Sequence, residues 1–513
     1  MKLIDWLLNQ KSPGPIPPAP VAESPQNSGT EAVPATTNEA DRILLSFGDT
    51  NHNTYTIGQS FNGCVIFGAT GSGKTSGSGA ALARAFLSTG YGALVLCVKA
   101  EEADLWRRYA AETGRQNDLI FFGSDPRWRF NFLDYEARRP GVGAGLTENL
   151  IQLFVEVSSI GEGEAIGGKG DDPFWERAMR SLIRNLLDTL MLAKKPITLP
   201  AMFEVLRSAP QDAATASSAS WATDSLCAQM LAAANEATVN TPARSDYEQT
   251  AAYWLREFPT MPDKTRGSVV EMFRTMAESL MRGTMRTLFC EGKSNVIPEH
   301  TLTGKILIID LPVKQWGGVG RYAGVMWKYC WQKAIERRRD NADGHGRPVA
   351  LWADEFQFFS TKNDYLYQTT ARSSRAATVY LTQTMSGLIA ALGGEINGKS
   401  RVDALLANLD TKIFHANSDR DTNHWASELL GRDRLQFHSR SMNYSPFSKG
   451  GPSYGSSVSE QMEFRVQAVI FTELKKGGPT NKKIVQAIVF QTGRTWATDA
   501  GPRNWVLVEF HQC

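Results

Sequence analysis

The segment "GATGSGKT" at residues 68–75 has the residue types and spacing of a loop that binds the phosphates of a nucleotide. Its glycines allow backbone N–H groups to turn inward around an anion, and the start of a helix adds partial positive charge. Lys74 should reach the β and γ phosphates, and Thr75 should ligate Mg²⁺. The apolar run "CVIF" supplies the preceding strand that such a loop requires. The expected nucleotide-binding residues are Gly68, Ala69, Thr70, Gly71, Ser72, Gly73, Lys74, Thr75 and Ser76.

A carboxylate pair follows a second apolar run in "RPVALWADEFQFF" at residues 347–359. Asp354 is suited to hold Mg²⁺ through water, and the adjacent Glu355 to polarise the water that attacks the γ-phosphate. Acidic pairs of this kind also begin solvated helices. Next to a complete phosphate loop, however, the pair favours nucleotide hydrolysis.

Three further residues are candidates for catalysis. The run "ATVYLTQT" at 377–384 reads as a strand that ends at the ligand-binding edge of a parallel sheet, so Gln383 is placed to sense the γ-phosphate or position water. Arg372 and Arg375 are expected on a helix just upstream, where either could act on a neighbouring subunit's nucleotide. Each arginine could equally form a surface ion pair.

The elements between these motifs predict an α/β fold interrupted by a large insertion. Strands are expected at 92–98, 118–122 and 304–313, and apolar residues at helical spacing fill most of 147–289. We therefore predict a nucleotide-binding domain at 41–145 and 300–513, and an inserted all-α domain at 146–299. Residues 158–172 and 209–220 are expected to be its loops. A strand, a turn and a helix with a glycine stop are expected over 408–431.

Composition places few limits on function. The chain of 513 residues has a net charge of +2, which gives no strong overall attraction to nucleic acid. Its 6 cysteines are widely spaced and suggest buried thiols in a reducing compartment. No apolar run is long enough to cross a bilayer, so we expect a cytoplasmic protein.

The first forty residues combine an amphipathic start with a proline-rich linker. In "MKLIDWLLNQ" the apolar residues fall at helical spacing, so residues 1–10 could dock on a membrane surface or a membrane partner protein. A disordered tail explains the same composition equally well.

Two segments could contact DNA. The cluster "AIERRRD" at 334–340 is more simply a solvated helix end. The segment at 432–461 interleaves arginines, aromatics, glycines and serines, and we expect a flexible loop there that could line a channel, although a plain surface loop is the favoured interpretation.

Taken together, several stretches resemble the TraG/TraD type IV coupling proteins, which are ATPases that deliver DNA or protein to secretion machinery. The resemblance covers most of residues 43–500. It is carried by "GATGSGKTSG", "FWERAMRSLIRNLL", "ALWADEFQFF", "VYLTQT", "LLANLDTKIFHANSDRDTNHWASELLG" and "VIFTELKKGGPTNKKIVQAIVFQTGRTW".

This resemblance implies a RecA-like nucleotide-binding domain, a helical domain that recognises substrate, and a homo-hexamer with a central DNA channel, using ATP and Mg²⁺. It maps Lys74, Thr75, Asp354 and Glu355 onto the nucleotide site and Gln383 onto the sensor glutamine. The spacing favours Arg372 over Arg375 as the arginine finger.

The sequence departs from this family at two points. Members usually begin with transmembrane helices, whereas this chain has the proline-rich lead, so stable membrane anchoring would need a partner at residues 1–10. In "LCVKAEE" the family's Asp-Pro-Lys-Gly-Glu element keeps Lys99 and Glu101 but has Cys97 in place of the aspartate.

The resulting hypothesis is an ATPase that moves DNA, or a DNA–protein conjugate such as one carrying a relaxase, toward a type IV secretion channel. The helical domain would recognise the substrate protein. A soluble DNA translocase in DNA processing or defence is the second interpretation. The third is a docking receptor that ATP switches with little turnover.

Overall fold

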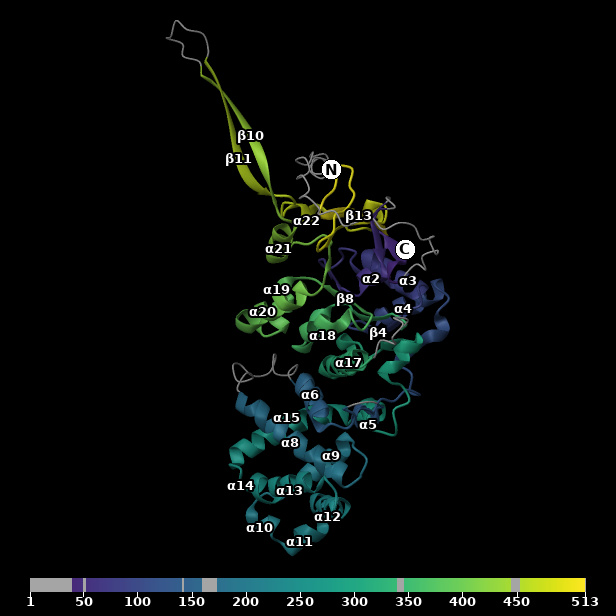
Figure 1. The fold of residues 1–513 in the computed structure, drawn as a ribbon, viewed down its shortest axis with the longest axis vertical. Helices are drawn as coiled ribbons and strands as arrows, with labels where there is room; N and C mark the ends of the chain where they lie inside the picture. The colour runs from purple at the N-terminus through teal and green to yellow at the C-terminus, as the bar shows by residue number, and fades with distance from the viewer. Residues whose placement is uncertain are drawn as a thin grey trace, which may run out of the picture. The chain divides into compact units, whose positions relative to one another are not determined.

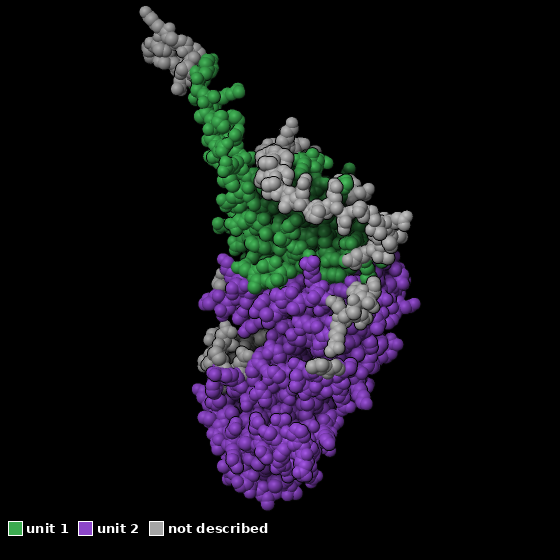
Figure 2. Space-filling view, in the orientation of Figure 1, with its two compact units in different colours: residues 1–86, 378–390, 402–513 green, residues 87–377, 391–401 purple. Residues whose placement is uncertain are grey.

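The computed structural model describes residues 39–48, 52–140, 143–158, 173–338, 346–443 and 453–512. The chain divides into two compact units, coloured separately in Figure 2. Unit 1 comprises residues 1–86, 378–390 and 402–513, and unit 2 comprises residues 87–377 and 391–401. The predicted amphipathic start, nearly all of the proline-rich linker, and residues 159–172 of the predicted loop at 158–172 lie outside the described residues.

Five strands of unit 1 lie side by side in the order β13-β12-β9-β3-β8, and the first two residues of β8 belong to unit 2. The central strand β3 pairs in parallel with β8 and β9, while β12 pairs antiparallel with β9 and with β13. Every residue of β3, β8 and β9 is buried, as expected for apolar strands covered on both faces. Their bounds are β3 Cys64–Phe67, β8 Ala376–Thr382, β9 Thr411–Phe414, β12 Ile484–Gln491 and β13 Trp505–His511.

Shorter elements and helices complete unit 1. A small antiparallel pair, β1–β2, precedes the sheet. The helix α21 follows β9 and ends at a glycine, so the predicted strand, turn and helix over 408–431 are confirmed. The bounds are η1 Glu39–Asp41, β1 Ile43–Ser46, β2 Thr54–Thr56, α2 Ile57–Ser60, η2 Thr75–Gly79, α21 Arg420–Leu430, α22 Ile470–Glu473 and η7 Pro479–Asn481. Three helices run across unit boundaries: α3 Ala80–Ser88, α19 Met385–Ala391 and α20 Gly394–Ala407.

A long hairpin extends away from the rest of unit 1 (Figure 1). Its strands, β10 Arg432–Asn443 and β11 Ser453–Phe464, pair antiparallel along all twelve residues of each. The prediction of a flexible loop over 432–461 is therefore wrong for the described residues, because regular pairing satisfies the backbone even though most side chains stay exposed.

Unit 2 contains four parallel strands in the order β7-β4-β6-β5. The helix α17 packs against β4 and β6, and α4 packs against β5. The predicted strands at 92–98, 118–122 and 304–313 are confirmed as β4, β5 and β6, which are two, one and six residues shorter than expected. The bounds are β4 Gly92–Leu96, α4 Glu101–Glu112, η3 Gln116–Asp118, β5 Leu119–Phe122, α5 Phe132–Arg138, η5 Pro298–Thr303, β6 Ile306–Ile309, α17 Val313–Glu336, β7 Val349–Ala353, η6 Phe356–Phe358 and α18 Asn363–Ala371.

The described residues between 147 and 289 contain helices and no strand, as the apolar spacing predicts. The expected loop at 209–220 instead includes two short helices, each begun by a side-chain cap from Asp212 or Ser218. The bounds are α6 Thr147–Ser158, α8 Pro173–Leu192, α9 Leu199–Arg207, α10 Ala213–Ala216, α11 Ala219–Asp224, α12 Leu226–Thr238, α13 Arg244–Ala252, η4 Tyr253–Glu257, α14 Phe258–Thr260, α15 Asp263–Leu280 and α16 Gly283–Phe289. The domain boundaries predicted from the sequence separate α/β segments from all-α segments, whereas the two units separate compact parts of the chain. The predicted boundaries at 145/146 and 299/300 therefore stay a prediction.

Candidate nucleotide site

The phosphate loop of unit 1 depends on glycine at positions where another residue would be strained. Gly71 and Gly73 have φ values of +73° and +85°, in the left-handed region that glycine adopts freely. A Cβ on Gly73 would lie 2.5 Å from a methyl carbon of Val485 on β12, so only glycine lets the loop approach this strand. After the loop the chain enters η2, a π-type turn that continues into α3.

The carboxyl ends of two neighbouring strands anchor this loop. The Gly68 N–H donates to the carbonyl of Thr382, at 3.2 Å, and the Ala69 N–H donates to the carbonyl of Ala416, at 3.0 Å. The buried hydroxyl of Ser72 has no hydrogen-bond partner among the described residues, and the Lys74 side chain is 6% exposed. A sheltered lysine and an unsatisfied hydroxyl beside glycine backbone form a cradle that suits an anion such as phosphate.

Gln383 follows β8 and lies beside the phosphate loop, as the strand pattern predicts. The Thr70 hydroxyl lies 3.3 Å from its Oε1 atom, and the Asn417 side chain donates to its carbonyl, at 2.8 Å. Ser76, the last of the predicted loop residues, accepts from the Gln512 side chain, at 2.7 Å. The predicted loop and the sensor glutamine are thus brought together within unit 1.

His415 is a residue of this site that the sequence analysis missed. It follows β9, is fully buried, and lies 2.7 Å from the Ser78 hydroxyl through Nε2 and 3.1 Å from the Gln486 carbonyl through Nδ1. Because a carbonyl only accepts, Nδ1 carries the proton and Nε2 accepts from Ser78. Burial, opposed by the Gln486 hydrogen bond and reinforced by the Lys74 charge, lowers the His415 pKa to about 3, so the ring is neutral. His415 therefore fixes the start of the helix behind the phosphate loop.

Unit 2 carries the predicted carboxylates at the end of β7. Asp354 and Glu355 are both buried, and the Glu355 N–H donates to Asp354 Oδ1, at 2.8 Å. Glu355 has φ of 49° and ψ of 50°, a left-handed conformation that is rare for a residue with a side chain. Such backbone strain persists where surrounding contacts impose it and is frequent at functional sites.

Both oxygens of the Glu355 carboxylate are oriented by nearby side chains. Lys99 Nζ lies 3.4 Å from Oε1, and Gln357 Nε2 donates to Oε2, at 2.9 Å. Burial acts to lower the Lys99 pKa, but the charges of Glu355, Asp354 and Glu102 together raise it. Lys99 is therefore cationic and holds Glu355 in one orientation.

The resemblance to the coupling proteins points to Glu101, but the buried acid of this segment is Glu102. Glu101 is exposed, whereas Glu102 is buried and accepts from the backbone N–H groups of Val98 and Lys99, at 2.9 and 3.3 Å. Burial and the Asp354 charge raise the Glu102 pKa to about 8. The buried acid thus shapes the turn after β4 that carries Lys99.

Arg372 and Arg375 do not lie on a helix as predicted. The helix α18 ends at Ala371, and the two arginines form the turn that precedes β8, where Arg375 has a φ of +50°. The turn forms because the Arg375 N–H donates to the Arg372 carbonyl, at 3.1 Å. Arg372 is exposed and Arg375 is partly buried, so action on a second subunit stays a prediction for either residue.

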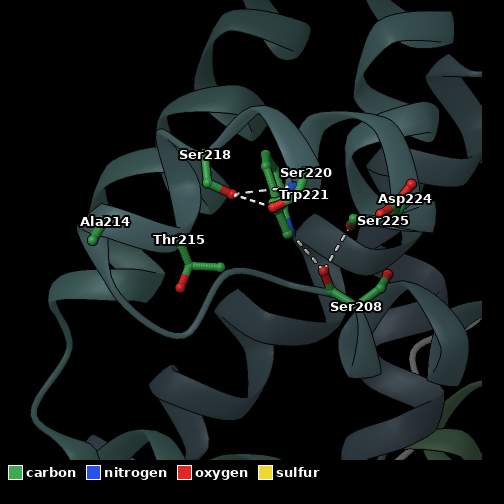
Figure 3. Close-up of a pocket in the computed structure, with 8 residues that line it drawn as sticks. All are labelled: Ser208, Ala214, Thr215, Ser218, Ser220, Trp221, Asp224 and Ser225. Carbon is green, nitrogen blue, oxygen red and sulfur yellow. Dashed lines mark hydrogen bonds between the residues drawn. The ribbon is translucent and has the colours of Figure 1, made fainter.

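The helical part of unit 2 has an open depression of about 640 Å³, lined mostly by hydroxyl side chains with Trp221 and Asp224 (Figure 3). The Trp221 indole and the Ser225 hydroxyl both donate to the Ser208 carbonyl, at 2.8 and 2.7 Å. These bonds satisfy the indole N–H of Trp221 and the hydroxyl of Ser225 within the depression.

A parallel α/β fold with a glycine-rich phosphate loop after one strand and an acidic pair after another defines a P-loop nucleotide-binding protein. Residues 348–469 match the family model described as the TraM recognition site of TraD and TraG. The predicted resemblance to the TraG/TraD coupling proteins is thereby confirmed for this segment. No curated protein matches the chain.

Solved structures described as the bacterial conjugative coupling protein TrwBdeltaN70 and as the plasmid coupling protein TrwB share this fold. The trigonal form with sulphate has 14% sequence identity and a TM-score of 0.59, covering 93% of this chain and 91% of that chain. The complex with ADP and Mg²⁺ has 14% identity, a TM-score of 0.58 and the same coverage. The complex with a non-hydrolysable GTP analogue has 13% identity and a TM-score of 0.57, covering 93% and 90%. The predicted α/β P-loop fold is therefore confirmed. Among the described residues, no helix is long and apolar enough to cross a membrane.

Proposed function

We propose that the chain is a coupling protein that hydrolyses ATP and uses the energy to move DNA, or a DNA–protein conjugate, into a type IV secretion channel. The observation that carries the proposal is the buried, doubly oriented Glu355 at the end of β7, in a chain that also contains a complete phosphate loop. A protein that only binds nucleotide has less need of such a carboxylate. The family match and the shared fold support the same proposal.

The phosphate loop fits ATP through backbone and side-chain donors. Gly71, Gly73 and the buried Lys74 offer N–H groups and a cation to the phosphates, and the Ser72 hydroxyl is an additional donor. The hydroxyl of Thr75 and the carboxylate of Asp354 are the hard oxygen ligands that suit Mg²⁺. The bound Mg²⁺ would neutralise charge on the phosphate oxygens.

Glu355 is the proposed general base. Lys99 and Gln357 hold its carboxylate so that it can accept a proton from water, while Gln383 senses the γ-phosphate. Arg372, or else Arg375, would act on the nucleotide of a neighbouring subunit in a hexamer. The helical part of unit 2 would recognise a relaxase or another secreted protein, and a membrane partner would hold residues 1–10.

The test is ATP turnover by the purified protein and by Glu355→Gln, with and without single-stranded DNA. We expect DNA to stimulate the wild type, and the variant to bind ATP normally while its kcat falls by about 10²-fold or more. Glu112→Gln, at the exposed end of α4, is a matched control, since it makes the same carboxylate-to-amide exchange and keeps Glu355, Lys99 and Gln357. ATP binding without turnover in the wild type under every condition would instead favour the ATP-switched docking receptor.

A further inference from the structure

An exposed loop in unit 2 carries a cation, an aromatic ring and two glycines in immediate succession. This loop is the interrupted beginning of α17, Lys314–Gly318 ("KQWGG"), and it starts five residues after the end of β6. All five of its residues are exposed. Trp316 is 38% exposed, and every other tryptophan whose side chain the structure describes is less exposed. Gly317 has φ of 56° and ψ of −137°, which interrupts the helix, and the space around both glycines is open.

This loop lies at the same sheet edge as Glu355. The strands β6 and β7 both pair in parallel with β4, so their carboxyl ends meet at one edge. Lys314 Nζ lies 5.2 Å from the centre of the Phe358 ring, and the Arg321 guanidinium donates to the Phe358 carbonyl, at 2.8 Å. The Phe358 N–H in turn donates to the Glu355 carbonyl, at 3.0 Å. A displacement of Lys314 would therefore be passed to Glu355, the proposed base, through Phe358 alone.

The chemistry of the loop selects its ligand. One exposed ring among polar and glycine residues is too small for a protein interface, which buries about 800 Å² on each partner. A single ring is, however, the unit on which one nucleic-acid base stacks, and an adjacent cation pairs with the phosphate backbone. The two open glycines leave room for a strand to approach. A duplex hides the faces of its bases, so the ring fits a single strand.

We propose that Lys314–Gly318 is a contact site for single-stranded DNA, with a base stacked on Trp316 and a phosphate at Lys314, and that Phe358 transmits this contact to Glu355. The proposal rests on the function proposed above and deepens it.

The experiment measures two quantities on the full chain: affinity for a fluorescent single-stranded oligonucleotide, and ATP turnover with and without that oligonucleotide. The test variant is Trp316→Ala, Trp316→Phe should preserve stacking, and the neighbouring Gln315→Ala is the matched control. We expect Trp316→Ala to weaken binding by about fivefold or more and to lose stimulation while keeping basal turnover. Phe358→Leu should keep the affinity and lose part of the stimulation.

The two proposals fail differently. Unchanged affinity and stimulation in Trp316→Ala would overturn the loop site and leave the DNA motor standing. A wild type that binds the oligonucleotide without any stimulation would overturn the motor, and weaker binding by Trp316→Ala would still support the contact site. Equal loss of affinity in Gln315→Ala would show a general disturbance of the loop and also overturn the role of the ring.

Discussion

At the scale of single residues, His415 makes the stability of unit 1 depend on pH. Its pKa in the fold is about 3, below the ordinary value of 6.5, so its neutral form is stabilised fully above pH 6.5 and progressively less as the pH falls toward 3. Between pH 6.5 and about 5 the unfolded chain binds a proton that the fold does not, which corresponds to about 2 kcal/mol. The glutamine of His415→Gln cannot titrate. We therefore expect the free energy of unfolding of this variant, measured with urea at pH 6.5 and pH 5, to lose that part of its pH dependence.

The control for this prediction is Gln461→Asn on the exposed strand β11, which exchanges one neutral polar side chain for another and keeps His415, so it should keep the wild-type pH dependence. An identical pH dependence in the wild type and His415→Gln would show that folding does not lower the His415 pKa.

The sequence predicts the residues that belong to a motif better than the residues that contact and orient them. The phosphate loop and the acidic pair have fixed spacings that follow from their chemistry. His415 has no such spacing, and its one signal is that it follows a buried strand at the same sheet edge as Gln383. The αL conformation of Glu355 and its contact with Lys99 depend on residues far apart in the chain, so no local pattern contains them.

At the scale of elements, a buried ion pair fixes the segment that follows Glu355. Lys328 on α17 contacts Asp364 Oδ2 at 2.5 Å and donates to the Phe359 carbonyl, at 2.6 Å; both charged side chains are about 1% exposed. Lys328→Met would leave the Asp364 charge buried without its cation, a change that typically costs about 3–5 kcal/mol. We therefore expect a large loss in the free energy of unfolding, measured by urea denaturation.

A double variant separates this charge effect from poor packing. Lys328→Met with Asp364→Leu removes both charges and should recover much of the lost stability, because replacing a whole buried pair by apolar groups is often neutral. A double variant less stable than Lys328→Met alone would mean that packing around the new side chains, rather than an unpaired charge, causes the loss.

The β10–β11 hairpin shows where sequence patterns fail for an element. Strand prediction depends on one buried face, yet Tyr454, Val458 and Met462 are all more than half exposed. The residues between them are glycine, serine, glutamate and glutamine. The strands form because their register pairs every backbone position, which hydropathy does not report. The buried strands β3, β7 and β8 could be predicted because they are continuous apolar runs between polar ends.

At the scale of the whole molecule, the proposed hexamer requires that one subunit completes the site of the next. If Arg372 acts in trans, Lys74→Ala subunits cannot bind ATP but can still supply the arginine, and Arg372→Ala subunits can bind ATP but lack it. Each variant alone should be inactive. In an equal mixture that assembles at random, about half of the subunits bind ATP, and about half of those have a neighbour that supplies the arginine. About one quarter of the sites are then complete, so about one quarter of wild-type turnover should return.

A second mixture distinguishes trans action from simple rescue by assembly. Lys74 and Glu355 are both proposed to serve the nucleotide of their own subunit, so mixing Lys74→Ala with Glu355→Gln should restore no turnover. Recovery in both mixtures would place Glu355 across the subunit boundary as well. If Arg375 is the arginine finger instead, Arg372→Ala alone should keep its turnover. Arg375→Ala alone should then be inactive and should recover about one quarter of wild-type turnover when mixed with Lys74→Ala.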